Sequence, residues 1–283
     1  MTILIKGVRR MQCIKKYKGS IAFILGIFFF WIFRGIMQLL RLLDMDVTSW
    51  RFTSSVQRLV FGVFQLWIFV KLFDKKNWKN IINTQGLRKG LLASLGMILF
   101  TVYYITTYFT FGFGGFEGLT MPLLCAIILQ QITTGFWEGL TFRAFFLEGI
   151  MIKIGDRWYG RLVAAFISAT IFGMAHLIGI SSLEQAIYRF ITTGVIGLVF
   201  AAIYIYSKNI LWSMIIHAIY DIPANLISYV TYSQQHPIKV FLSQEYIFYG
   251  CYPLIGIVAI IFIVVASPWE EKKANTEHIT IDV

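Results

Sequence analysis

The fold is decided by the longest apolar stretch in the chain, residues 121–151, which read MPLLCAIILQQITTGFWEGLTFRAFFLEGIM. A transmembrane helix needs roughly 20 mainly apolar residues to cross about 30 Å of hydrocarbon. This stretch exceeds a single crossing, so we expect a helix that is tilted, or broken at Gly135 or Gly139. It also contains Glu138 and Arg143, and charged residues at such a depth usually face the interior of a helical bundle.

Further apolar stretches of similar length lie on both sides of this one, with short polar breaks between them. A chain of this kind crosses the bilayer repeatedly. We therefore predict an all-α, polytopic helical membrane protein with about eight transmembrane helices. The other seven are expected at Ser20–Leu43, Val56–Phe73, Gly90–Phe113, Leu162–Ile180, Ile187–Tyr206, Ile210–Tyr229 and Tyr246–Ala266.

The composition agrees with a membrane protein and excludes three other classes. Of the 283 residues, 58% are hydrophobic and only 14% are charged, which leaves too few polar side chains to cover a soluble globule of this size. The aromatic content of 17% excludes a disordered chain. The three cysteines, Cys13, Cys125 and Cys251, are too few and too scattered for a disulfide scaffold. The lipid bilayer is therefore the expected surrounding.

The net charge of +11 comes from short basic clusters between the apolar stretches. This pattern is typical of membrane proteins, in which loop charges set the topology, and not of nucleic-acid-binding proteins. When alternate loops are assigned to the two sides, 18 Lys and Arg residues fall with the N-terminus. Both termini are therefore expected in the cytoplasm. We interpret the first stretch as a retained span, because it is too long for a signal peptide. The opposite side receives Arg41, Arg51, Arg58, Arg189 and Lys239.

Ionisable groups inside the predicted spans are the candidates for function, because burying one at mid-bilayer costs from about 2.5 kcal/mol upward. On an ideal α-helix a residue five places on is rotated by about 140°, so Glu138 and Arg143 are not expected to share a face. A structural Glu/Arg pair that fixes helix packing is the simpler alternative. The candidates are Arg34, Glu138, Arg143, Glu148, His176, His217 and Asp221, with Asn225 as a neutral companion.

Two further spans supply histidines. The spacing of His217, Asp221 and Asn225 places them on one stripe of a helix, where the carboxylate can orient the imidazole. Pro223 predicts a kink beside this stripe. Phe172 and His176 lie one turn apart in the preceding histidine-bearing span. Taken singly, each histidine fits a packed, hydrogen-bonded residue between helices.

Taken together, these groups suit hydrolysis of an unactivated carbonyl, which needs a base for water and either a Lewis acid or hydrogen-bond donors for the oxyanion. Glu138 is the candidate base. His176 and His217 are candidates either for oxyanion donors or for metal ligands, and the residues alone leave both open. The expected cofactor is accordingly none, or zinc.

The same residues resemble the CAAX-prenyl protease and bacteriocin-processing (CPBP, or Abi) intramembrane proteases. That family has two adjacent glutamates followed after three residues by arginine, then Phe and His four apart, then His and Asn or Asp four apart. The chain matches with Glu138 and Arg143, then with Phe172 and His176, then with His217 and Asp221. The motifs occur in the family's order within Met121–Tyr229.

The resemblance implies an eight-helix bundle in which Glu138 activates water, while His176, His217 and Asp221 stabilise the oxyanion or bind a metal. It implies supporting roles for Arg143, Phe172 and Asn225. The chain departs from the pattern at Gly139, which stands in place of the second glutamate. This departure removes a carboxylate that a zinc site would use, and so favours a metal-independent glutamate mechanism.

Three regions are expected on this basis: transmembrane helices in residues 1–120 (about three spans), a catalytic core in 121–230, and a last helix with a cytoplasmic tail in 231–283. The predicted function is an intramembrane endopeptidase of a bacterial cell membrane. Its substrate is expected to be a peptide or a membrane protein, such as a peptide pheromone or bacteriocin precursor.

Two other functions remain open. One is an inactive membrane protein of the same fold, acting as a scaffold or in bacteriocin immunity, and Gly139 is its best support. The other is a proton-coupled transporter, which would also place Glu, His and Asp in the membrane. A transporter predicts paired broken helices in two related halves, and the chain lacks such an internal symmetry.

Overall fold

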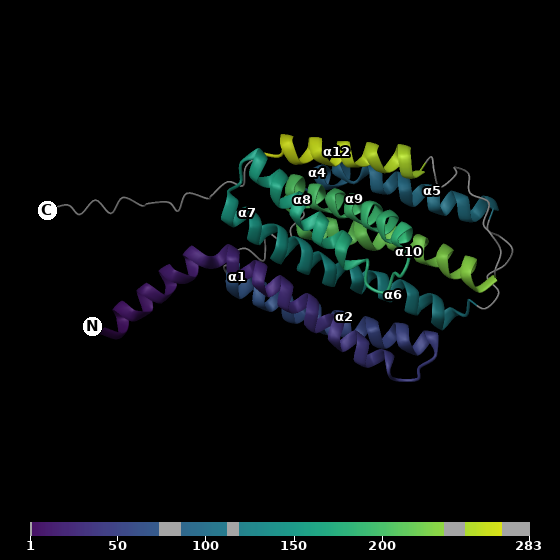
Figure 1. The fold of residues 1–283 in the computed structure, drawn as a ribbon, viewed down its shortest axis with the longest axis horizontal. Coiled ribbons are helices and arrows are strands. Elements are labelled where there is room, and N and C mark those ends of the chain that lie inside the picture. Colours follow the sequence, from purple (N-terminus) through teal and green to yellow (C-terminus); the bar gives the residue numbers. More distant parts are fainter. Residues whose placement is uncertain (1, 74–85, 112–118, 235–246, 268–283) are drawn as a thin grey trace.

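The computed structural model describes residues 2–73, 86–111, 119–234 and 247–267, which are almost wholly helical and contain no strand. The helices form one bundle with most axes along its length (Figure 1). They are α1 (Thr2–Arg41), α2 (Val47–Phe73), α4 (Leu87–Ala93), α5 (Leu95–Phe111), α6 (Met121–Glu138), η1 (Gly139–Leu147), α7 (Glu148–Ile154), α8 (Trp158–Ala175), α9 (Leu183–Ser207), α10 (Ile210–Gln234), η2 (Ile247–Cys251) and α12 (Tyr252–Val265).

Within these residues, seven helices are long and apolar enough to cross a membrane. They correspond to all the predicted stretches except Gly90–Phe113, and they confirm an all-α polytopic membrane protein. The remaining stretch is also helical but divided, because α4 passes into α5 through the single residue Ser94. The hydroxyl of Ser94 donates to the carbonyl of Gly90 at 2.6 Å, which satisfies a backbone acceptor at this junction.

The first and last described helices place their outer ends at the same end of the bundle. In Figure 1 the Thr2 end of α1 and the Val265 end of α12 both lie on the left. An even number of crossings produces this arrangement. The assignment of that end to the cytoplasm rests on the basic residues and stays a prediction.

The expected start of the second span is wrong. Helix α2 begins at Val47 and not at Val56, so Arg51 lies within the helix and not in a loop, and Arg58 lies further from the helix start than predicted. Asp46 initiates the helix, because its Oδ1 accepts hydrogen bonds from the backbone N–H groups of Thr48 and Ser49 at 2.9 and 3.1 Å. Because the first turns of α2 are polar, a prediction based on apolar residues placed the start of this span too late.

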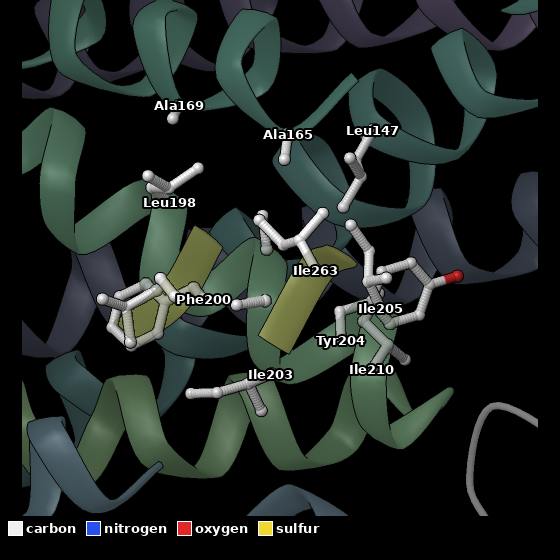
Figure 2. Packing of buried hydrophobic residues seen from close by; sticks show 14 of the residues in the cluster. Leu147, Ala165, Ala169, Leu198, Phe200, Ile203, Tyr204, Ile205, Ile210 and Ile263 are labelled. Carbon is white, nitrogen blue, oxygen red and sulfur yellow. The ribbon is translucent and has the colours of Figure 1, made fainter. Parts of the chain in front are cut away.

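Helix α9 is the centre of the bundle. About 67% of its apolar window is buried, against 22% for α2 and α12, whose outer faces are left for lipid. It packs against α8 on one side and α12 on another. Figure 2 shows this packing around Leu147, Ala165, Ala169, Leu198, Phe200, Ile203, Tyr204, Ile205, Ile210 and Ile263.

A polar contact crosses this core near one end of α9. The hydroxyl of Tyr204 donates to Oε2 of Glu148 at 3.0 Å. Replacing Tyr204 with Phe removes that donor from a carboxylate inside the bundle, and such a loss costs about 1–3 kcal/mol. We expect thermal unfolding in detergent to report a lower stability of about this size.

The matched control for this change is Tyr188→Phe on the same helix, where the side chain is 39% exposed. This variant should unfold like the wild type. Equal stability of the Tyr204→Phe protein and the wild type would show that Glu148 does not depend on this hydrogen bond.

Candidate active site

The long stretch at residues 121–151 is neither straight nor broken. Helix α6 continues into a π-helical segment, η1, that begins at Gly139, and then into α7. Two side chains from other helices form hydrogen bonds with residues of this π-helical segment. Ser168 Oγ donates to the carbonyl of Phe142 at 2.8 Å, and Gln65 Nε2 donates to Thr141 Oγ1 at 2.9 Å. Extra hydrogen-bond partners of this kind stabilise a π-helical turn, and such turns are frequent at functional sites.

The π-helical winding changes the geometry between Glu138 and Arg143 from that of an ideal α-helix. A π-helix has i→i+5 hydrogen bonds, so residues five apart are separated by about one turn. Accordingly, Arg143 Nη1 donates to the backbone carbonyl of Glu138 at 3.4 Å. The guanidinium group is 1% exposed and lies over the rings of Phe172 and Phe200, with its carbon 5.0 and 4.8 Å from their centroids. Arg143 therefore holds the backbone beneath Glu138.

His217 links two carboxylates from different helices. Its Nε2 lies 3.2 Å from Asp221 Oδ2, one turn further along α10, and 3.7 Å from Glu138 Oε2 at the end of α6. The imidazole is buried and stacks on the ring of Phe200 at 4.4 Å. Helix α10 continues through Pro223, and Asn225 Nδ2 donates to the backbone carbonyl of Asp221 at 2.9 Å. The stripe predicted on this helix thus meets Glu138.

His176 sits at the end of α8 and not inside a longer helix, because α8 ends at Ala175. Its Nδ1 lies 2.8 Å from the carbonyl oxygen of Phe172. A carbonyl only accepts hydrogen bonds, so Nδ1 carries the proton and Nε2 of the neutral ring has a lone pair. Phe172 lies between the two histidines, with its ring 4.6 Å from that of His176 and 6.0 Å from that of His217.

Several polar atoms at this site are buried without a hydrogen-bond partner among the described residues. They are Glu138 Oε2, His217 Nδ1 and Arg143 Nη2. Native proteins rarely leave such atoms unpaired, so each one calls for water or a ligand. The unpaired carboxylate oxygen is the most reactive of the three, since it is available to accept a proton from a bound water.

Gly139 marks a tight contact between α6 and α10. A Cβ atom at this position would lie 2.5 Å from Cγ of Met214, and one at Gly135 would lie 2.7 Å from the carbonyl oxygen of Met214. The glycines are four residues apart and allow α10 to approach closely, as small residues do between membrane helices. The place that a second glutamate would need is filled by Met214.

The side chains of this site are not arranged to hold a metal ion. Among the residues that the structure describes, no group of three or more His, Cys, Asp or Glu side chains is placed to hold a metal ion. Gly139 brings no carboxylate, and His217 turns Nε2 toward Asp221 and Glu138. No step of the chemistry below is therefore routed through a metal.

Phe200, Met214, Ser168 and Gln65 are site neighbours that the sequence did not indicate. Phe200 is one of 26 phenylalanines in the chain, and no local pattern distinguishes it from the others. Its role depends on where α9 crosses α10, which hydropathy does not report.

The helices of this bundle bring half-buried acids to the buried imidazole of His217, and ionisable groups inside membrane spans usually have a function. Residues 120–223 match the family model described as type II CAAX prenyl endopeptidase Rce1-like. This segment contains Glu138, Arg143, His176, His217 and Asp221, and it carries the fold of an intramembrane CAAX-type endopeptidase. The match confirms the family resemblance drawn from the motifs. Neither curated proteins nor solved structures gave a match.

Proposed function

We propose that this protein is an intramembrane endopeptidase in which Glu138 activates the attacking water. The observation that carries this proposal is the buried, unpaired Oε2 of Glu138, 3.7 Å from His217 Nε2. A gap of this size between two polar atoms suits a bridging water. The Rce1-like match supports the same reaction class.

In the proposed reaction, Glu138 takes a proton from water while the water oxygen bonds to the carbonyl carbon of the peptide. The carbonyl π electrons move to its oxygen, and the N–H of His217 Nε2 stabilises the resulting oxyanion. Asp221 orients that imidazole. His176 contributes a second donor only as an imidazolium, since its Nδ1 proton goes to Phe172. Glu138 then returns its proton to the leaving nitrogen as the C–N bond breaks.

The depth of the site defines the kind of substrate. Glu138 lies near the middle of the candidate span Met121–Ile154. A peptide bond must therefore enter the membrane region to reach it, which suits a membrane-anchored or membrane-inserting peptide. A peptide pheromone or bacteriocin precursor in a bacterial membrane meets this requirement, and we propose substrates of this class.

A peptidase assay tests the proposal. The full chain in lipid nanodiscs would be incubated with an N-terminally acylated random peptide library, and products would be identified by mass spectrometry. We expect cleavage by the wild type and a loss of about 10²-fold or more in His217→Ala, the usual size for one oxyanion donor. Folded wild-type protein that cleaves no peptide would contradict the proposal.

Metal dependence is a separate prediction. Because the described donors do not form a metal site, we expect the protein to keep its full activity after treatment with a chelator. Elemental analysis of the treated protein confirms that it is metal-free. Activity that is lost and then restored only by zinc would contradict the glutamate mechanism.

One observation favours a second candidate, an inactive scaffold or immunity protein of the same fold. Met214 occupies the space next to Gly139, so the site has been repacked at the position of the second family glutamate. This candidate predicts that a cellular function, such as protection from a bacteriocin, survives when Glu138→Gln and His217→Ala are combined. The endopeptidase proposal predicts its loss.

A further inference from the structure

Two arginines outside the family-matching segment interact electrostatically with Glu138. Arg34 belongs to the candidate span Tyr17–Arg41, and Arg58 to the candidate span Val47–Leu72. The charge of Glu138 acts on both arginines, and Arg58 also experiences the charges of Arg34 and Arg51. Helices α1 and α2 therefore bring a group of cations to the side of α6 that carries the candidate base.

Aromatic rings connect Arg58 to the turn that carries Glu138. The guanidinium carbon of Arg58 lies 5.7 Å from the ring centroid of Phe33 in α1. Phe33 stacks on Trp137 with a centroid separation of 3.7 Å and an interplanar angle of 25°. Trp137 immediately precedes Glu138 in α6, so this column connects Arg58 to the helical turn that carries the candidate base.

Three hydrogen-bond donors of this column have no partner in the part of the chain that the structure describes. Nε and Nη1 of Arg58 are buried without a partner among the described residues, and the same is true of Nε1 of Trp137. The ion pairs found in the described part of the chain involve Arg161 and His217, and they include neither Arg34 nor Arg58. Buried charged donors without an acceptor are costly, so an anionic ligand would remove a substantial penalty.

The depth of Arg58 decides which anion this is. Arg58 lies within the candidate span Val47–Leu72, and its Nε and Nη1 atoms are buried in the bundle. Lipid headgroups lie at the membrane surface and do not reach buried atoms of this kind. A ligand that reaches Arg58 must therefore come with a molecule that enters the bundle, as a peptide substrate does.

We propose that Arg58 binds a carboxylate of the peptide substrate close to the bond that is cut. The forked guanidinium matches the two oxygens of a carboxylate, and a peptide carries such a group at its C-terminus or on Asp and Glu side chains. This proposal rests on the proposed endopeptidase function. It adds a class of substrate, a peptide with a carboxylate near the scissile bond, and a residue that selects it.

The test compares matched fluorescent, N-terminally acylated peptides that differ only in their carboxylates. One set ends in a free carboxylate and the other in an amide, and each is made with and without Asp and Glu. Binding to the full chain in nanodiscs is measured by anisotropy, and cleavage by mass spectrometry. We expect loss of the recognised carboxylate to weaken binding by about tenfold or more, a typical effect of a charged hydrogen bond.

Variants locate this preference. Arg58→Gln should abolish it, Arg58→Lys should retain part of it, and the control Arg189→Gln, at an exposed arginine of α9, should leave it unchanged. Sensitivity to the terminal amide identifies the C-terminus as the source, and sensitivity to the missing Asp and Glu identifies a side chain. Either result supports the subsite.

The outcomes distinguish the carboxylate subsite from the proposed endopeptidase function. Equal binding of acidic and neutral peptides by the wild type would overturn the subsite, even if cleavage occurs and the endopeptidase function stands. A carboxylate preference that persists in Arg58→Gln would also overturn it. Carboxylate-dependent binding without any cleavage would support the subsite and contradict the endopeptidase function. Because the first comparison uses wild-type protein, misfolding of a variant does not prevent the test.

Discussion

Replacing Glu138 with Gln is expected to lower the rate of peptide hydrolysis by about 10²- to 10⁴-fold, the usual contribution of a general base. The amide keeps the size of the side chain but does not take a proton from water. It can still contact His217 Nε2, which lies 3.7 Å from the carboxylate in the native protein. The variant should therefore remain folded and bind peptide while kcat falls.

The matched control is Glu184→Gln, at an exposed glutamate in the first turn of α9. It removes the same charge at an exposed position that makes no contact with Glu138 or His217 among the contacts described above, and it should have wild-type kinetics. Thermal unfolding of both variants in the same detergent separates a chemical effect from a structural one. Unchanged hydrolysis by a folded Glu138→Gln protein would remove Glu138 from the role of base.

Gly135→Ala is expected to disturb both stability and activity, because the new methyl group would lie 2.7 Å from the backbone carbonyl oxygen of Met214. A backbone atom does not rotate away as a side chain does, so α6 and α10 must separate. Overpacking of this kind costs about 1–3 kcal/mol. The same two helices carry Glu138 and His217, and a misplacement of about 1 Å at a reacting centre lowers the rate by up to about 10²-fold.

Gly35→Ala in α1 is the control, since a Cβ there meets nothing within 4 Å. It should be as stable as the wild type or slightly more so, because alanine favours a helix more than glycine does. Thermal unfolding and the peptidase assay are measured on both variants. A Gly135→Ala protein with wild-type stability would show that the contact between α6 and α10 is looser than the structure indicates.

Hydropathy was sufficient to predict the membrane spans, because the need for a long apolar segment depends only on that segment of the chain. A segment that crosses lipid must be apolar for roughly 20 residues whatever surrounds it. It was not sufficient where a helix turns polar residues toward the protein. The first turns of α2, with Arg51, were left outside the predicted span for this reason. The stretch Gly90–Phe113 was predicted as one helix, but its described residues belong to two, α4 and α5.

In the candidate site, too, the sequence predicted some contacts and missed others. The spacing of His217 and Asp221 predicted their contact, because residues four apart on an α-helix are neighbours. The π-helical winding between Glu138 and Arg143 was not predicted, and the side chains that hydrogen-bond to this segment, Ser168 and Gln65, come from other helices. Such partners are distant in sequence, so no local pattern reports them.

By itself, the sequence determined that this chain is a helical membrane protein, and it singled out Glu138, His176, His217 and Asp221 as candidates for its chemistry. Apolar length and the cost of buried charge are properties of the chain alone. The tertiary structure decided that His217 faces both Glu138 and Asp221, that Met214 fills the place beside Gly139, and that Phe33 connects Arg58 to Trp137. These relations depend on how separate helices pack, because close packing, and not sequence spacing, sets which side chains meet across a bundle.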